Sequence, residues 1–536
     1  MPSAGPSDVT FTSEADFPLV RVRERMRQGE SLRDAARGEA RATHRPAAPL
    51  LAAARSQADL VASPIATRVC RGTSCELRGA AQVAEALAGD GPVRPAYCLG
   101  YCHRSPAVLD TAGGVWVDVD PARIVRDLGQ PAPLPSAPRV ESLGPAIVTR
   151  RIGRGDFSPF VKARADGAYQ ILDKARSLGR EHVLREVERS GERGRGGAGY
   201  PTGAKWRRAA AAEGEPLVIA NGDEGDPGSF IDRVLLERDP HGVIEGLALA
   251  AFAVGARRGV VFIRSEYPRA ARRMRDALAE AERAGALGRE LRIDVVEGFG
   301  SYVAGEETAL IAALAGERGE VRPRPPYPAE HGLAGHPTVV NNVETLVNVP
   351  WIVEQGGDAF AAIGTAHSNG TKALCLNSGF ASAGIVEVPF GVVLRDVIQD
   401  WGATSCHEAE LEGVLVGGPM GSFLEPQACD VPICWETLGL RLGHGGLVAV
   451  PRGTDLRALA THLLAFAAHE SCGRCVPCRA GSARALALAQ EDLAADAEPL
   501  RAVLETMRAA SLCPFGRDAP GPILALLERA ARSGCA

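Results

Sequence analysis

Near its C-terminus the chain reads Cys472-Gly473-Arg474-Cys475-Val476-Pro477-Cys478-Arg479, and Ser511-Leu512-Cys513-Pro514 follows. Three cysteines at C-x2-C-x2-C, closed by a remote fourth, have the spacing with which proteins hold a [4Fe–4S] cluster. Zinc sites more often use two pairs of ligands, and four buried free cysteines are the other alternative. The spacing therefore predicts a cluster and a protein that handles single electrons.

The sequence around these cysteines has the apolar period of helices. Leu456, Leu459, Ala460 and Leu463 recur at i, i+3 and i+4, which indicates one helix before the cysteine triple. Three further helices are predicted, over 483–494, 500–507 and 523–531. We therefore expect residues 453–536 to form a four-helix bundle whose first interhelix loop carries the triple.

Composition restricts the class of protein. The 536 residues are 46% hydrophobic and 23% charged with a net charge of −5, which is typical of a globular protein of several domains and gives no support for nucleic-acid binding. We find no signal-like N-terminus and no apolar run long enough to span a bilayer. Most of the 13 cysteines fall into two ligand-like groups, which favours metal clusters over disulfides and a cytoplasmic location.

The second cysteine group lies in a compact segment, 65–130. Strands at 66–69, 93–97, 107–110 and 115–119, with helices at 80–88 and 122–128, give the order βαβββα of a small α/β sandwich. The cysteines follow the first two strands: Cys70, Cys75, Cys98 and Cys102. Two pairs of thiolates on neighbouring loops predict a [2Fe–2S] cluster, with zinc or a purely structural role as alternatives.

The remaining boundaries follow from composition and period. Residues 1–64 are expected to be a surface or partner-docking arm with one short helix within 19–41, and the proline-rich segment 131–149 a stiff linker. Residues 150–365 alternate helices (169–176, 243–254, 270–286) with strands (217–220, 259–263, 291–296), which predicts a layered α/β domain. In 366–452, strands at 373–376, 384–388, 413–416 and 446–450 surround one helix at 394–399, as in a β-grasp-like module.

A glycine-rich loop, Gly194-Arg195-Gly196-Gly197-Ala198-Gly199, precedes Lys205 in the α/β domain. It satisfies G-x-G-x-x-G, but a helix precedes it where a dinucleotide fold needs a strand, and it is no Walker loop. Its glycines nevertheless let the backbone lie against a flat ring or a phosphate. A flexible surface loop is the alternative.

Polar groups gather in three more segments of this domain. The strand at 217–220 ends in Asn221-Gly-Asp223-Glu224-Gly-Asp226, where open α/β sheets bind ligands. These carboxylates form either a solvated turn or acceptors for ribityl and ribose hydroxyls, which would favour NAD over NADP. Segments 300–308 and 337–345 add an aromatic residue, carboxylates and amides, so we expect one shared site.

Together these motifs resemble the flavin- and NADH-binding subunit of respiratory complex I and its relatives, the diaphorase subunits of NAD-linked formate dehydrogenases and hydrogenases. The resemblance covers 150–536 and implies a Rossmann-like FMN domain. Residues 65–130 resemble a thioredoxin-like [2Fe–2S] domain, which in complex I belongs to a separate subunit. The FMN residues it implies are Gly194, Arg195, Gly196, Gly197, Lys205, Asn221, Asp223, Glu224, Tyr302, Gly305, Glu306, Asn341, Asn342 and Thr345.

The same resemblance implies that NAD(H) lies on the exposed flavin face. Its implied contacts are Tyr200, Asp226, Glu307 and Arg324, and Cys472, Cys475, Cys478 and Cys513 would hold the [4Fe–4S] cluster. Relatives usually carry Glu in place of Asp226 and a second aromatic in place of Arg208, which leaves nucleotide affinity open.

A hydride carries two electrons and an iron–sulfur cluster accepts one, so a flavin must stand between them. Glu306 and Glu307 are assigned positioning roles, and no side chain is assigned acid or base catalysis. The implied partners are the catalytic and electron-transfer subunits of a larger redox complex, with formate dehydrogenase favoured over a hydrogenase or complex I-like assembly. A non-catalytic electron carrier and a bifurcating subunit are the alternatives.

Overall fold

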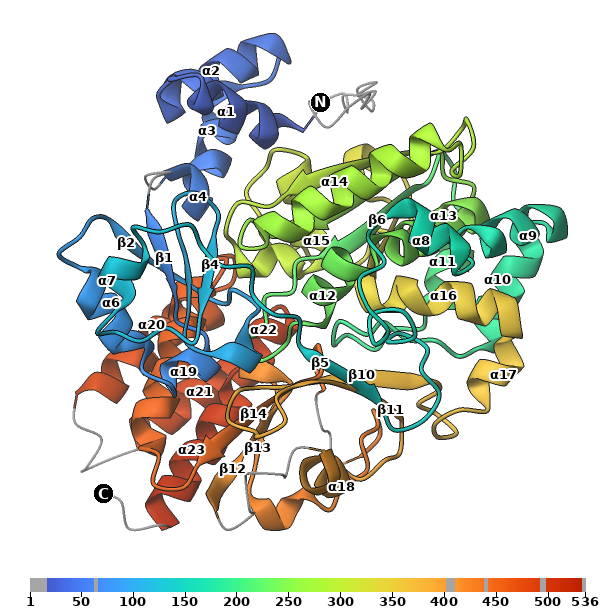
Figure 1. The fold of residues 1–536 in the computed structure, drawn as a ribbon. Helices are drawn as coiled ribbons and strands as arrows, with labels where there is room; N and C mark the ends of the chain where they lie inside the picture. Colours follow the sequence, from blue (N-terminus) through green and yellow to red (C-terminus); the bar gives the residue numbers. More distant parts are fainter. Residues whose placement is uncertain (1–16, 62–65, 402–409, 438–441, 492–497, 533–536) are drawn as a thin grey trace.

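The computed structural model describes residues 17–61, 66–401, 410–437, 442–491 and 498–532, in which helices surround three β-sheets (Figure 1). The strand orders are β2-β1-β3-β4, β8-β7-β6-β9 and β13-β12-β14-β10-β11-β5. The fold is thus the mixed α/β arrangement that the sequence predicts.

The sheet β8-β7-β6-β9, which we call the central sheet because it has a core on each face, is parallel throughout. Its strands are β6 (Leu217–Gly222), β7 (Arg258–Ile263), β8 (Arg292–Glu297) and β9 (Thr338–Asn342). Alternate β6 residues point into two different cores: Val218 and Ala220 into one, Leu217 and Ile219 into the other. Burial on both faces explains the near-continuous apolar strands.

The helices of this region cover both faces of the sheet (Figure 1). They are α8 (Phe160–Ala165), α9 (Gln170–Leu178), α10 (Arg180–Arg189), α11 (Thr202–Ala211), α12 (Ile231–Arg238), α13 (Pro240–Val254), α14 (Pro268–Arg283), α15 (Glu307–Leu314), α16 (Val343–Gln355) and α17 (Gly357–Ala361). Helix α13 is buried along nearly its whole length and packs on α16. The predicted helices at 169–176, 243–254 and 270–286 fall on α9, α13 and α14.

The N-terminal segment is more structured than the single short helix expected there. It forms α1 (Pro18–Arg27), α2 (Leu32–Ala42), α3 (Ala47–Arg55) and α4 (Ala58–Val61). The expected helix is broken because Gly29 has a φ of +99° and Ser31 caps α2 by accepting from Asp34 N. The inner faces of these helices share a core with Phe299, Leu310 and strand residues of the central sheet, so this side of the arm is buried.

The sheet β2-β1-β3-β4 comes next. Its elements are β1 (Thr67–Cys70), α5 (Thr73–Glu76), α6 (Ala80–Leu87), β2 (Val93–Ala96), β3 (Ala107–Leu109), β4 (Val115–Val117) and α7 (Ile124–Asp127). Apart from the single turn α5 and a 3-10 helical turn at Cys102–Arg104, this is the predicted order βαβββα. Val69, Val83, Val108 and Ile124 form its core. Cys70 ends β1 and Cys75 follows it, and Cys98 and Cys102 follow β2.

The third sheet contains an unexpected strand from the proline-rich linker. Its strands are β5 (Arg139–Ser142), β10 (Thr371–Leu376), β11 (Gly384–Pro389), β12 (Leu411–Val416), β13 (Ser422–Leu424) and β14 (Gly446–Pro451). β5 pairs in parallel with β11, and the buried Glu387 carboxylate accepts the N–H groups of Ile147, Val148 and Thr149 at 2.8–3.1 Å. The linker is therefore bound to the sheet rather than free. The expected helix at 394–399 is α18 (Leu394–Asp396) followed by a π-helical turn, Val397–Trp401.

The C-terminal helices pack on β12 and β14 through Leu415 and Val448. They are α19 (Leu456–Glu470), α20 (Val476–Gln490), α21 (Glu498–Ala510), α22 (Pro514–Asp518) and α23 (Pro520–Arg532). Helix α20 begins earlier than the predicted residue 483, because Cys475 occupies its N-cap and Pro477 its first turn. Two cysteines of the triple therefore lie at a helix start.

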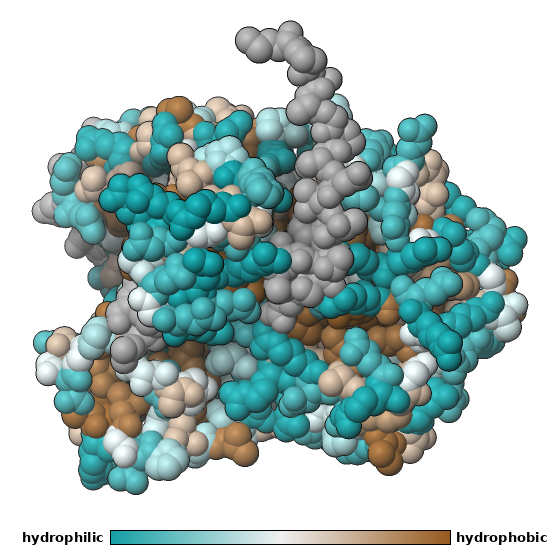
Figure 2. Space-filling view, turned by 90° about the horizontal axis from the view of Figure 1, so that it is seen from above, coloured by the Kyte–Doolittle hydropathy of each residue, from teal (hydrophilic) through white to brown (hydrophobic). Residues whose placement is uncertain are grey.

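In the described residues, no helix combines the length and the hydropathy that a bilayer crossing requires. Figure 2 shows hydrophilic side chains over most of the coloured face, with apolar residues in separate patches.

Candidate functional site

The carboxyl ends of β6 and β9 bring the predicted amides together. Asn221 and Asn342 are paired in register. Asn221 donates to the Gly305 carbonyl at 2.7 Å, and Asn342 donates to Asp232 at 2.5 Å while capping α16 through Thr345 N. Trp206 Nε1 donates to Asn341 Oδ1 at 2.8 Å. Segments far apart in sequence thus meet at one edge of the sheet.

The glycine loop lies against this edge. Arg195 N donates to Thr345 Oγ1 at 2.9 Å. A Cβ on Gly196 would lie 3.2 Å from Asn342 Cβ, and Gly197 has a φ of +104° with Gly443 Cα only 3.1 Å from its Cβ position. Side chains are therefore excluded and backbone forms the wall, as a cradle for a ring or phosphate requires. The Arg195 side chain points away and pairs with buried Glu192, so only its backbone belongs to this loop.

A charged network joins Lys205 to the start of α15. Lys205 Nζ lies 3.1 Å from Glu307 Oε2 and donates to the Val340 carbonyl at 2.9 Å. Arg324 pairs with Glu306 and, at 3.2 Å, with Glu307. Burial acts to raise the pKa of Glu307, but the charges of Lys205 and Arg324 lower it below the usual value. Beside this network, the Tyr200 side chain is 41% exposed.

The acidic turn after β6 is buried, not solvated. Burial raises the pKa of Asp223 to about 8. Glu224 is fully buried and accepts from the N–H groups of Asp232 and Arg233 at 3.2 and 3.0 Å, so it fixes the start of α12. Asp226 accepts from the Tyr302 hydroxyl at 2.5 Å and lies 3.2 Å from His444 Nδ1.

Sequence reasoning missed His444 and Asp232. His444 comes from the loop before β14, in the segment predicted as a separate module, and no local pattern marks it. Asp232 lies in the same charged segment as the acidic turn, and this position could have marked it as a site residue. Its contact with Asn342, however, depends on tertiary packing.

The C-terminal cysteines converge in an apolar setting. Cys478 and Cys513 belong to a core with Phe466 and Phe515, against which Cys472 and Cys475 pack. Burial, with the charges of the other three cysteines, raises the pKa of Cys478 to about 11, although the hydrogen bond with Ser471 acts to lower it. Four thiols close enough to repel one another as thiolates suit a cluster that neutralises them.

The N-terminal cysteines also lie close together. All four are buried, with Sγ–Sγ distances of 4.0 Å between Cys70 and Cys98 and 3.3 Å between Cys98 and Cys102. In the part of the chain that the structure describes, no three His, Cys, Asp or Glu side chains are arranged to hold one metal ion. A bridged cluster instead distributes its ligands over several irons, and four soft thiols fit that chemistry.

The N-terminal cysteines border the acidic turn. A Cβ on Gly72 would lie 3.3 Å from Cys98 Sγ and 3.4 Å from Pro227 Cβ. Arg264 donates both to the Glu224 carbonyl, at 2.5 Å, and to the Tyr97 carbonyl, at 2.8 Å. The two sites therefore share a wall.

A chain of aromatic rings links the N-terminal cysteines, the carboxyl end of β6 and the C-terminal cysteines. Phe466 lies between Tyr97 and Tyr302, with ring centroids 5.4 and 5.2 Å away, and Tyr302 lies 5.4 Å from Phe515. Tyr97 precedes Cys98, and Phe515 follows Cys513 by two residues. The thiol groups and the β6 edge thus form one continuous region.

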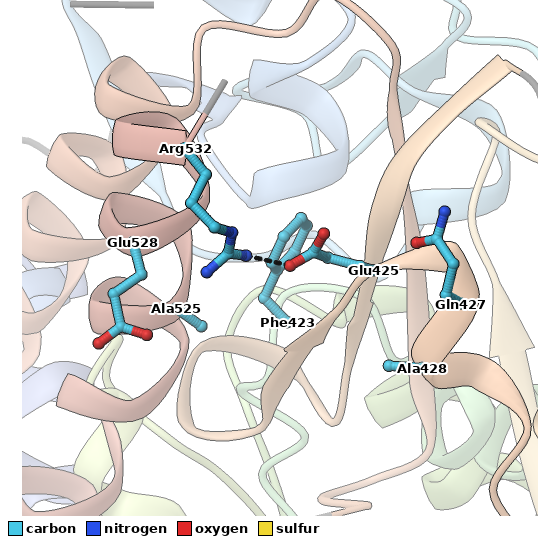
Figure 3. Close-up of a pocket in the computed structure, with 7 residues that line it drawn as sticks. All are labelled: Phe423, Glu425, Gln427, Ala428, Ala525, Glu528 and Arg532. Atoms are coloured by element: carbon cyan, nitrogen blue, oxygen red, sulfur yellow. Dashed lines mark hydrogen bonds and ion pairs between the residues drawn. The ribbon is translucent and has the colours of Figure 1, made fainter. Parts of the chain in front are cut away.

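A separate groove lies away from this region. It has a volume of about 490 Å³ and is lined by Phe423, Glu425, Gln427, Ala428, Ala525, Glu528 and Arg532. Figure 3 shows Glu425 and Arg532 paired across it. No residue of the predicted sites lines it.

Comparisons with known proteins give this arrangement a family. Residues 187–351 match the family described as Nuo51 FMN-binding domain, and residues 458–532 match the NADH-ubiquinone oxidoreductase-F iron-sulfur binding region. The NADP-reducing hydrogenase subunit HndC of Solidesulfovibrio fructosivorans is 39% identical over 398 residues, which cover 71% of this chain and 81% of that protein. The NADH-quinone oxidoreductase-F protein of Aquifex aeolicus is 40% identical over 59% of this chain and 75% of its own.

A solved structure resembles nearly the whole chain. It is an NAD+-reducing [NiFe]-hydrogenase in the H2-reduced state, which matches with a TM-score of 0.84 and 30% identity over 95% of this chain and 90% of that one. Fold and site therefore define an NADH dehydrogenase-type flavoprotein oxidoreductase component. The chain belongs to the NADH-quinone oxidoreductase-F family, which includes the related hydrogenase subunits. This confirms the predicted resemblance, with FMN-binding and [4Fe–4S]-binding regions.

Proposed function

We propose that the chain is the diaphorase subunit of a larger redox complex: it exchanges hydride with NAD(H) at FMN and single electrons with a [4Fe–4S] cluster. The observation that carries this is the meeting of the glycine loop, the β6 and β9 ends and Tyr302, whose ring lies 5.4 Å from Phe515 next to the C-terminal cysteines. When bound, FMN supplies the conversion between two-electron and one-electron transfer.

The chain's own residues bind and orient the flavin. The backbone of Gly194–Gly197 and the amides of Asn221, Asn341 and Asn342 hold the flavin, with Lys205 directed to its phosphate. Amide, carboxyl and ammonium groups at the ends of parallel strands are the donors and acceptors that ribityl hydroxyls and a phosphate need. Glu224 acts indirectly, because it caps α12.

The nucleotide lies on the exposed side, at Tyr200, Glu307 and Arg324. Tyr200 has the exposed ring needed for stacking. Asp226 is assigned differently from the sequence prediction: it is only 5% exposed and bonded to Tyr302 and His444, so we place its role inside the flavin pocket.

The N-terminal cysteines hold a [2Fe–2S] cluster in a thioredoxin-like domain, 65–130. Its contact with the acidic turn through Gly72 and Arg264 supports electron exchange with the flavin, as an entry point or a side branch. The other proposed units are the arm 1–64, the linker 131–149, the Rossmann-like domain 150–365, the β-grasp module 366–452 and the cluster-bearing bundle 453–536.

The partner is a catalytic subunit that handles the terminal substrate. Formate dehydrogenase is the partner favoured by the sequence, and the near full-length likeness to an NAD+-reducing hydrogenase favours a hydrogenase as the second candidate. Formate-dependent or H2-dependent reduction of NAD+ by the complex purified under low oxygen distinguishes them.

The function is tested on the purified full-length chain. We expect stoichiometric FMN, six irons per chain for the two clusters, and NADH-dependent bleaching of both flavin and cluster absorption. Absence of FMN from folded protein would instead support the non-catalytic electron carrier.

A further inference from the structure

His444 lies at the centre of a buried charged cluster behind the glycine loop. Its side chain is 13% exposed. Its Nδ1 lies 3.2 Å from Asp226 Oδ2, and its Nε2 lies 3.6 Å from Asp232 Oδ2. The imidazole therefore bridges the acidic turn after β6 and the first turn of α12.

The backbone of His444 is also fixed. Lys372 Nζ donates to its carbonyl at 3.2 Å. A Cβ on Gly196 would lie 3.4 Å from His444 Nε2, and one on Gly197 would lie 3.1 Å from Gly443 Cα. The loop before β14 thus packs against the glycine loop. A change in charge at His444 therefore acts on the backbone that we propose binds the flavin.

The ionisable groups around His444 come from four elements. Asp223, Glu224 and Asp226 follow β6, Asp232 lies on α12, Glu344 on α16 and Lys372 on β10. Lys372 pairs with Glu344. Of the remaining carboxylates, Asp226 lies nearest to the imidazole, at 3.2 Å, and Asp232 lies at 3.6 Å.

The pKa values of His444 and Asp226 shift in the directions expected of an ion pair. Burial alone lowers the pKa of His444, but the hydrogen bond and charge of Asp226, with the charges of Asp232 and Glu224, raise it to about 9. Burial alone raises the pKa of Asp226, but His444 and Tyr302 lower it below its usual value. Burial and Glu224 raise the pKa of Asp232 to about 8, so Asp226 is the main counter-ion.

We propose that His444 is a positioning residue of the flavin site, whose imidazolium neutralises Asp226 behind the glycine loop and so lets the cradle accept the phosphate-bearing flavin. The inference rests on the proposed flavin site. An unpaired carboxylate there would repel the phosphate through a medium of low dielectric, and would itself be costly to bury.

The test measures the Kd for FMN by quenching of flavin fluorescence on titration of the flavin-depleted full-length chain. The variants are His444→Gln, Asp226→Asn and the double variant, and His331→Gln at an exposed histidine is the matched control. The substitution leaves the buried Asp226 carboxylate without its charged partner, and one hydrogen bond to a charged group is worth at least a factor of about ten, so we expect His444→Gln to raise the Kd for FMN at least about tenfold. In the double variant most of the affinity returns, because no charge is left unpaired.

The pH profile gives a second readout. The folded pKa of His444 lies above its ordinary value, so its charge is present below pH 8 and lost as the pH rises through about 9. The wild-type Kd therefore rises across this window. Asp223 and Asp232 ionise near pH 8 in both proteins, so the His444→Gln profile keeps their contribution and rises less than that of wild type.

Three results would overturn the inference. If His444→Gln binds FMN within twofold of wild type, the inference fails while the proposed function stands. If the affinity falls, circular dichroism is unchanged and Asp226→Asn restores nothing, the role is not charge neutralisation. If folded wild type does not bind FMN, both proposals fail.

Discussion

Lys372→Met tests how far a buried ion pair holds the flavin domain and the β-sheet module together. Lys372 and Glu344 are both 0% exposed and paired, and Glu344 also accepts from Ala373 N at 3.0 Å. Methionine keeps the apolar stem but leaves the Glu344 carboxylate with backbone contacts. Removing one partner of a buried pair costs about 3–5 kcal/mol. At about 2–4 °C per kcal/mol for a region of this size, the transition midpoint falls by about 6–20 °C.

The assay is differential scanning calorimetry of the full-length chain, with the midpoint of the first transition as the readout. Adding Glu344→Gln to Lys372→Met restores most of the loss, because the amide oxygen still accepts from Ala373 N. Arg207→Met is the control, since Arg207 pairs with Glu181 and Glu188 at the surface and such pairs contribute about 0–1 kcal/mol. A drop below about 2 °C for Lys372→Met, less than the loss of even 1 kcal/mol would give, or a double variant no better than the single, would refute the reasoning.

Other expectations concern the site itself. Glu307→Gln weakens NADH binding or slows flavin reduction, by about tenfold for one lost charged contact, as stopped-flow kinetics would measure; unchanged kinetics remove its positioning role. Cys478→Ser lowers the iron content and removes the [4Fe–4S] EPR signal but keeps FMN, whereas joint loss of both would contradict independent sites. The folded pKa of Asp223, about 8, exceeds its ordinary 3.8, so between these values the folded state holds a proton that the unfolded state has lost. The flavin-depleted protein therefore loses stability as the pH rises from about 4 to about 8. Thermal midpoints of Asp223→Asn should fall less over the same range, and parallel curves would argue against the raised pKa.

Local pattern was sufficient where the chemistry is local. The turn after β6 and the strands 217–220 and 259–263 depend on spacing and period, and they lie where the sequence placed them. The cysteine triple follows α19 as predicted, but Cys478 lies inside α20 rather than in the loop. The start of α20 was misplaced by several residues, because its first turn is dictated by the cysteine N-cap and Pro477 rather than by an apolar stripe.

Long-range contacts were beyond the sequence. β5 forms only because β11 offers an edge, and Glu387 collects three N–H groups from residues about 240 positions away. His444 meets Asp226 across 218 positions. No single-sequence period encodes such pairings.

The pairing of β5 with β11 has a consequence for assembly. In a two-chain arrangement, a separate cysteine-bearing domain would have to find its partner chain by diffusion and would be lost on dilution. Here residues 131–149 tether the N-terminal domain and are held to the third sheet through β5. This gives the N-terminal domain an effective local concentration in the millimolar range or higher. The N-terminal domain therefore docks in a one-to-one ratio that is independent of expression level, and dilution does not separate its cysteines from the turn after β6.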